Sequence, residues 1–265
     1  MNLFFRELKS YRIGLFWWAI GMVAMVGSGM AKFATFQSTG QSMNVLLDQF
    51  PKSIQTIFGM TGFDLSKASG YYGVLFMYIA LMATIHAVLL GAGIISKEER
   101  DRTSEFLFAK PISRFKVITS KIMAGLFNLI IINIVTFLSS VYFIDYFGKG
   151  VYVMNEIIVL MAGLFFLQLL FFLVGTSIAA AYKKSKTSMS IATSALLFTF
   201  ILSVLINVNE KLDVLKYLTP FRYFDARDLM TSGHLDLVYV SISSILIIIM
   251  MAVTYRAYDG RDLSV

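Results

Sequence analysis

Six apolar stretches, each long enough to cross a lipid bilayer, constrain this chain more than any other feature. An α-helix needs about 20 mostly apolar residues to span the hydrocarbon core. Of the 265 residues, 57% are apolar and 15% are charged, whereas a soluble domain carries roughly 25% charged residues. A larger core cannot absorb this excess, because a chain of this size still needs a polar surface in water. The sequence therefore predicts an all-α membrane protein with six transmembrane helices, at residues 13–36, 72–95, 122–144, 157–181, 189–208 and 237–255.

The rest of the sequence does not divide the chain further. It holds no internal repeat and no Pro/Gly/Ser-rich linker, so residues 1–265 are expected to form one membrane domain. The absence of cysteine excludes disulfides and thiolate metal sites. His86 and His234 do not have the spacing of a metal-ligand pair, so no metal site is expected. The first apolar stretch is too long for the core of a cleavable signal peptide.

The distribution of Lys and Arg predicts the orientation. Fifteen of the 23 Lys and Arg lie in residues 1–12, 96–121, 182–188 and 256–265, which carry a net charge of +8, against −1 for the remaining segments. Cytoplasmic segments of membrane proteins are enriched in Lys and Arg, so these four segments and both termini are placed in the cytoplasm. Because the basic residues alternate with apolar stretches, the net charge of +7 is attributed to membrane orientation, and no nucleic-acid partner is expected.

The longest cytoplasmic connection, residues 96–121, combines many charges with an apolar cluster. Thr103 or Ser104 can cap a helix, Glu105 suits its first turn, and Pro111 ends it. The expected helix is roughly two turns long, which is too short to be stable without tertiary contacts.

This short helix would expose the apolar cluster formed by Phe106, Leu107 and Phe108. Three explanations stay open on the sequence alone. The cluster can enter the lipid interface, it can pack against the protein's own helix ends, or it can bind a soluble partner, with the surrounding charges setting the register.

The same loop resembles a known family. The run EERDRTSEFL at 98–107, followed by PISR at 111–114 and by Lys121, is similar to the ABC-2 family of ATP-binding-cassette transporter permeases. The similarity extends to the six spans, to LTPFRYF at 218–224 before the last span, and to the tail YDGRDL at 258–263.

The resemblance implies a cytoplasmic coupling helix that sits in a groove of a separate ATPase subunit. Two ATPase subunits are expected, together with a second permease that is either a copy or a paralogue. The residues that the resemblance and the exposed cluster assign to ATPase contact are Glu98, Glu99, Arg100, Thr103, Glu105, Phe106, Leu107, Phe108, Pro111 and Arg114.

The chain itself lacks the means to bind ATP in the usual way. It contains no G-x-x-x-x-G-K-[ST] phosphate-binding loop. We therefore expect a non-enzymatic subunit that binds no cofactor, with ATP and Mg²⁺ held by the partner ATPase.

The first twelve residues, MNLFFRELKSYR, have an amphipathic pattern. Phe4, Leu8 and Tyr11 fall on one helical face, and the basic residues Arg6, Lys9 and Arg12 are interspersed among them. This pattern predicts either an amphipathic helix lying on an anionic membrane surface or a plain basic anchor for the first span. The resemblance implies an elbow helix that also touches the ATPase, with Phe4, Arg6, Leu8 and Lys9 as its candidate contacts.

The external loop at residues 209–236 carries a second helix signal. Thr219 can cap a helix with Pro220 in its first position, and Gly233 suits its far end. Phe221 and Phe224 would then share one face, which either lies against the outer leaflet, closes the outer mouth, or forms part of an aromatic belt. The resemblance implies that Pro220, Phe221 and Phe224 belong to an external cap over the translocation pathway.

Few polar residues lie deep in the spans. His86 is the one ionisable side chain far inside a span, and Asn128, Asn133 and Gln168 are similarly placed. His86, Asn128 and Asn133 are candidates for a polar pathway, but hydrogen bonding between helices is the favoured explanation for such residues. Small residues spaced by four also predict close helix approaches, at Ala24/Ser28, Ala87/Gly91, Gly175/Ala179 and Ser177/Ala181.

Taken together, these features predict the permease subunit of an ATP-driven exporter in a bacterial plasma membrane, working as a dimer with two ATPase subunits. The alternative is an ATP-independent, ion-coupled secondary transporter, but the six predicted spans contain no interior Asp or Glu for ion binding. A membrane-embedded enzyme is disfavoured because the spans hold no paired carboxylates and no His cluster.

Overall fold

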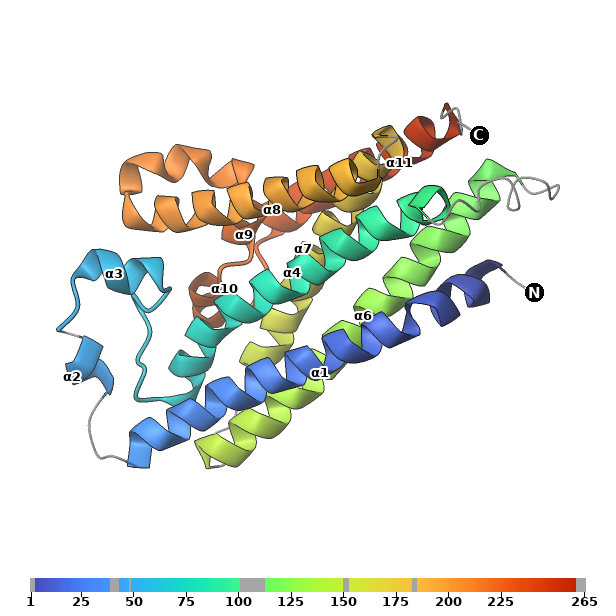
Figure 1. Cartoon of the computed structure of the whole chain (residues 1–265). Coiled ribbons are helices and arrows are strands. Elements are labelled where there is room, and N and C mark those ends of the chain that lie inside the picture. Colours follow the sequence, from blue (N-terminus) through green and yellow to red (C-terminus); the bar gives the residue numbers. More distant parts are fainter. Residues whose placement is uncertain are drawn as a thin grey trace.

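Figure 1 shows the chain as a computed structural model, which describes residues 3–38, 43–47, 49–100, 113–149, 153–182 and 185–260. Within these ranges every regular element is helical. Six helices are long and apolar enough to cross a membrane, and each contains one of the predicted spans, which confirms the all-α, six-span fold. They are α1 (Leu3–Ser38), α4 (Ala68–Arg100), α6 (Arg114–Gly148), α7 (Met154–Ala181), α8 (Ser185–Val208) and α11 (Leu237–Asp259).

The described parts of the bundle have two different ends (Figure 1). At one end, called here the terminal end, lie the start of α1, the last turns of α4 and α11, and the start of α6. The other end, called the loop end, carries the short elements. These are α2 (Met43–Leu47), α3 (Lys52–Ile57), the 3-10 helix η1 (Glu210–Leu218), α9 (Pro220–Tyr223) and α10 (Ala226–Ser232).

The centre of the bundle is the pair α4 and α7, whose apolar windows are 61% buried, compared with 11% for α11. Gly91 of α4 lies against the backbone of α7, and Gly175 of α7 lies against the backbone of α4. A Cβ on either glycine would collide with a carbonyl oxygen of the facing helix. Small residues allow this approach, so the pairs Ala87/Gly91 and Gly175/Ala179 belong to the α4–α7 contact. The predicted pair Ala24/Ser28 is instead exposed on α1.

The prediction of a separate elbow helix is not met. Residues 3–12 form the first turns of α1, and the helix continues without a break to Ser38. The physical reason is that no proline or helix-capping motif interrupts the sequence near Arg12, and Leu3, Phe4, Leu8 and Tyr11 pack against the protein core instead of facing lipid.

The single short helix expected between Thr219 and Gly233 is also corrected, because the structure forms two. The Asp225 side chain accepts a hydrogen bond from the Arg227 backbone N–H at 2.9 Å, which caps a new helix and separates α9 from α10. Gly233 ends α10 in the left-handed conformation, at φ +70°, as its sequence position suggests. Thr219 precedes α9, but its hydroxyl donates to the Thr199 carbonyl at 2.8 Å and so ties this segment to α8.

Candidate functional site

Most of the residues assigned to ATPase contact fall outside the described part of the chain. Thr103, Glu105, Phe106, Leu107, Phe108 and Pro111, and with them the predicted coupling helix, lie outside the described residues. Glu98, Glu99 and Arg100 form the last turn of α4, but their side chains also lie outside the described part. These assignments therefore stay predictions.

Arg114 is the one predicted contact residue whose side chain is described. It begins α6, and its guanidinium donates to the Asp259 carbonyl at 2.6 Å and to the Tyr258 carbonyl at 3.4 Å. Because the last carbonyls of a helix have no partner within that helix, a cation here satisfies them and suits the helix dipole. Arg114 thus holds the start of α6 against the end of α11.

A buried ion pair, which the sequence analysis missed, joins α1 to α4 at the same end. Glu7 is fully buried, and its carboxylate accepts hydrogen bonds from Lys97 at 3.2 Å and from Arg6 at 3.1 Å. Lys97 also lies 5.7 Å from the centre of the Tyr11 ring. A buried carboxylate is tolerated only when paired, so Lys97 fixes the last turns of α4 beside the first turns of α1. The sequence did contain an indication that Glu7 is buried, since Glu7 falls on the same helical face as the apolar residues Phe4 and Leu8.

A second buried cation ties α6 to α4. Lys121 is fully buried, and its ammonium group donates to the carbonyl oxygen of Ile94. The helix that precedes residues 101–112 is therefore anchored through Lys97, and the helix that follows them is anchored through Lys121 and Arg114.

The predicted elbow residues take different positions. Phe4 and Leu8 pack against the core, and the Phe4 ring lies 6.4 Å from that of Phe127 in α6. Arg6 pairs with Glu7, and Lys9 is exposed.

The polar residues inside the spans do not gather at one place. Asn133 donates to the Gln168 side chain and to the Met161 carbonyl, both at 3.2 Å, so it joins α6 to α7. Asn128 bonds its own helix, at the Ala124 carbonyl. His86 is buried with its ring 5.2 Å from that of Trp18. Neither of the two cavities described below is lined by His86, Asn128 or Asn133, and their pathway role stays a prediction.

A cavity of about 680 Å³ opens at the loop end between α4 and α8. Phe76, Met77 and Ala80 line it from α4, and Phe200 and Val204 line it from α8. Ala80 lies three and four positions after Met77 and Phe76, and Val204 lies four after Phe200, so the residues of each helix share one face. Residues of α3, α9 and α10 complete the wall. The sequence analysis did not predict this cavity.

The predicted cap residues help to build this cavity. Phe221 and Phe224 are buried and line it, rather than lying on a membrane surface. The Phe221 ring lies 5.2 Å from those of Phe171 and Phe200, and the Phe224 ring stacks on Phe166 at 5.7 Å. Pro220 provides the first residue of α9, where its missing N–H has no consequence.

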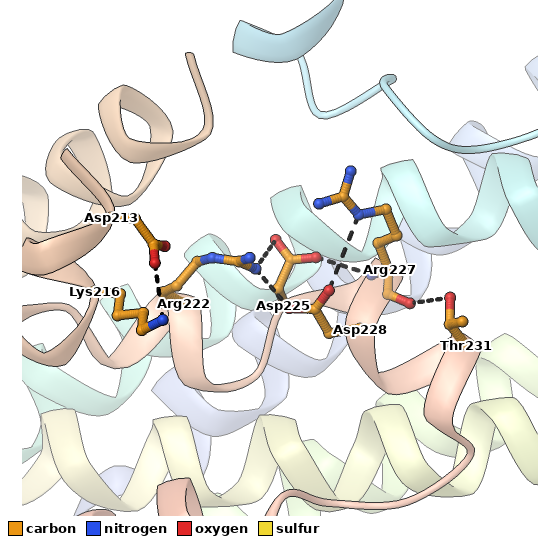
Figure 2. A network of polar contacts seen from close by, with 7 residues as sticks. All are labelled: Asp213, Lys216, Arg222, Asp225, Arg227, Asp228 and Thr231. Carbon is orange, nitrogen blue, oxygen red and sulfur yellow. Dashed lines mark hydrogen bonds and ion pairs between the residues drawn. The ribbon is translucent and has the colours of Figure 1, made fainter. Parts of the chain in front are cut away.

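Figure 2 shows the charged groups beside this cavity. The Arg222 guanidinium donates to Asp228 at 2.7 Å and lies 3.7 Å from Asp225, and Lys216 pairs with Asp213 at 2.8 Å. Burial raises the pKa of the Asp225 carboxyl above its ordinary value, although the Arg222 charge opposes the shift. Burial acts to lower the pKa of Arg222, but the two carboxylates outweigh it and raise that pKa.

A second cavity, of about 430 Å³, lies between the end of α1, the α2–α3 region and the start of α4. Except for Gln55, its lining is apolar or aromatic. It offers no arrangement of polar groups for chemistry, and within the described ranges no three His, Asp or Glu side chains gather as a metal site.

Comparison with protein families matches residues 1–263 to the family described as ABC-2 family transporter protein. A comparison with curated proteins found no match. The family match covers almost the whole chain, including both cavities and the anchored helix ends at the terminal end.

Proposed function

Because the chain belongs to the ABC-2 transporter family, we propose that it is the permease subunit of an ATP-driven exporter. The single observation that carries the proposal is the family match over residues 1–263, on a bundle with six helices able to cross a membrane. The absence of a phosphate-binding loop from the sequence supports a separate ATP-hydrolysing subunit, which would hold ATP and Mg²⁺.

In this proposal both termini and residues 101–112 face the cytoplasm, in a bacterial plasma membrane. The Lys and Arg distribution supports this orientation. The arrangement in Figure 1 agrees with it, because the start of α1 and the end of α11 lie at the same end of the bundle as the helix ends that flank residues 101–112.

Residues 101–112 would transmit ATPase movement through the anchored helix ends. Closure of two ATPase subunits around ATP would displace this segment, and Lys97, Lys121 and Arg114 would carry the displacement into α4, α6 and α11. ATP drives such a cycle only because the two transporter states bind it with different affinity. Alternating access of a paired permease is the expected outcome.

The second permease, a copy or a paralogue, would cover part of the outward surface of the bundle. The apolar windows of α1, α8 and α11 are only 22%, 22% and 11% buried. Phe16 and Trp17 on α1 and Phe198 on α8 are large, exposed side chains. Lipid and a second permease would share this surface.

The test is recruitment of the ATPase. The chain is expressed with a candidate ABC ATPase from the same genome, purified in detergent, and assayed for bound ATPase and for ATP-dependent export. Phe108→Asp and Glu105→Lys should abolish ATPase binding while the chain remains in the membrane. Val214→Asp is the control, because Val214 is an exposed apolar residue on η1 at the opposite end.

Two results contradict the proposal. In one, Phe108→Asp and Glu105→Lys retain both ATPase binding and export. In the other, the purified chain transports its cargo without any ATPase, which favours the secondary transporter.

A further inference from the structure

The cavity between α4 and α8 joins an aromatic interior to a charged rim. Phe76, Phe200, Phe221 and Phe224 form the apolar wall, while Lys52 of α3 and Arg227 of α10 belong to the rim. Its volume, about 680 Å³, falls within the usual range of roughly 300–1,000 Å³ for small-molecule sites. One charged end and one apolar interior suit an amphiphilic molecule.

The charges at the rim do not cancel. The charged groups in Figure 2 have a net charge of zero. The three positive side chains of Lys216, Arg222 and Arg227 are neutralised by the three carboxylates of Asp213, Asp225 and Asp228. Lys52 adds a positive charge that forms no ion pair within the described part of the chain. The cavity rim therefore carries a net positive charge.

Arg227 and Lys52 also have hydrogen-bond donors available. Among the described residues, the carboxylate paired with Arg227 is Asp228, at 4.0 Å from Nε, and Arg222 already binds that carboxylate at 2.7 Å. Figure 2 shows the two amino groups of Arg227 pointing away from Asp228. A guanidinium with free amino groups binds phosphate or carboxylate in a forked geometry.

The Arg227 side chain packs against the neighbouring loop. Gly62 has φ +86°, and a Cβ added there would lie 2.7 Å from Cδ of Arg227. The Arg227 side chain therefore lies close to the backbone at Gly62, and it is 43% exposed. This position leaves the guanidinium accessible at the cavity.

We propose that this cavity binds an amphiphile whose phosphate group is held by Arg227 and Lys52 and whose apolar chain lies along the four phenylalanines. The phosphate can belong to a membrane lipid or to a water-soluble amphiphile. Binding itself needs no ATPase, whereas a role of this ligand as the cargo rests on the proposed function.

The test measures binding to the full chain, purified and delipidated in dodecyl maltoside, by native mass spectrometry. The probes are dodecyl phosphate, dodecyl trimethylammonium and inorganic phosphate. Dodecyl phosphate should bind in one copy, and inorganic phosphate should bind at least tenfold more weakly because it lacks the chain. Equal or tighter binding of dodecyl trimethylammonium overturns the proposal.

Competition identifies the source of the ligand. If phosphatidylglycerol displaces dodecyl phosphate at equal concentration, the cavity is a lipid site. If phosphatidylglycerol does not displace dodecyl phosphate, the natural ligand is a water-soluble amphiphile. Either result is consistent with the proposal, provided that dodecyl phosphate itself binds.

Arg227→Gln and Lys52→Gln locate the site. Each should weaken dodecyl phosphate binding about tenfold, the usual effect of losing one charged hydrogen bond. Lys211→Gln is the matched control, since Lys211 is exposed on η1 and does not line the cavity. Lys52 is exposed, so its variant will fold even if Arg227→Gln does not. Unchanged binding in Lys52→Gln overturns the assignment and leaves the ATPase proposal untouched.

Discussion

Glu7 shows how a single residue can connect two helices at the terminal end. It is the acidic residue of an otherwise basic segment, and the structure buries it between Lys97 and Arg6. A buried ion pair adds little stability compared with an apolar contact in the same place. Removing one member of the pair, however, lowers the stability of the fold strongly, because the other charge stays buried without a partner. The pair therefore specifies which turns of α1 and α4 meet.

Glu7→Gln should destabilise the chain. It leaves Lys97 without its carboxylate in a site where the lysine side chain is 17% exposed. We expect a loss of about 2–3 kcal/mol, somewhat below that of a wholly buried pair, which corresponds to a decrease of roughly 5–10 °C in the unfolding temperature.

The measurement is thermal unfolding in detergent, with Asp145→Asn as the control, because Asp145 is an exposed acid near the end of α6. Adding Lys97→Met to Glu7→Gln should recover part of the loss. An unfolding temperature for Glu7→Gln equal to that of Asp145→Asn would show that the ion pair does not hold α1 to α4.

Asp225 predicts a dependence of stability on pH. Burial raises its pKa in the folded chain above the value of 3.8 for the free side chain. The folded state then binds the proton more tightly, so this stabilisation is complete below 3.8 and is lost as the pH rises through the folded pKa. Asp225→Asn removes the titration and keeps the helix cap. The variant should therefore gain stability relative to the natural chain as the pH rises.

The measurement is the difference in unfolding temperature between variant and natural chain, followed upward from acidic pH. Asp236→Asn is the matched control, because Asp236 is an exposed cap of α11 that accepts a hydrogen bond from the Val238 N–H at 2.7 Å. A difference for Asp225→Asn that stays constant with pH would contradict the burial of this carboxyl.

Among the helices, the contact between α4 and α7 depends on the absence of side chains at two positions. Alanine favours a helix over glycine by about 1 kcal/mol, but a methyl group on Gly91 would collide with the Phe172 carbonyl oxygen. Gly91→Ala should therefore destabilise the chain by roughly 2 kcal/mol net. Gly14→Ala is the control, since nothing lies within 4 Å of the position of its added methyl group.

Thermal unfolding of both glycine variants in detergent checks this prediction. Gly14→Ala should be as stable as the natural chain or slightly more stable. If Gly91→Ala behaves in the same way, the two helix backbones are not in contact.

The sequence predicts the long helices well because apolar length alone defines them. Each of the six expected spans lies inside one observed helix. Charged ends such as Arg114 extend the helices beyond the apolar stretches, because backbone hydrogen bonds do not require apolar side chains. The break at Phe224–Asp225 was missed because Asp225 was not recognised as a second cap, which starts α10 only a few residues after Thr219 starts α9.

The candidate sites were harder to predict than the helices. The sequence places Phe221 and Phe224 on a short helix, but it does not show that α4 and α8 enclose them around a cavity. Likewise, the sequence marks Lys97 and Glu7 as charged but does not bring them together across 90 residues. Such pairs depend on how the helices pack, which apolar patterns leave undetermined.

At the scale of the whole molecule, the proposed orientation is directly testable because the chain contains no cysteine. Lys9→Cys places a thiol at the terminal end, and Lys211→Cys places one at the loop end, both at exposed positions. A membrane-impermeant maleimide should label Lys211→Cys in intact cells and Lys9→Cys only after lysis. The reverse pattern would show that the termini lie outside.

The long helix α4 has a mechanical consequence for such a molecule. Its 33 residues extend about 50 Å, and about 32 Å of that length separates Phe76 in the cavity wall from Lys97 in the anchored turn. Since its backbone touches that of α7, α4 cannot slide on its own. A push at the terminal end would therefore move both helices together as one stiff unit, and the loop-end part of α4 would widen or narrow the cavity that Phe76 lines.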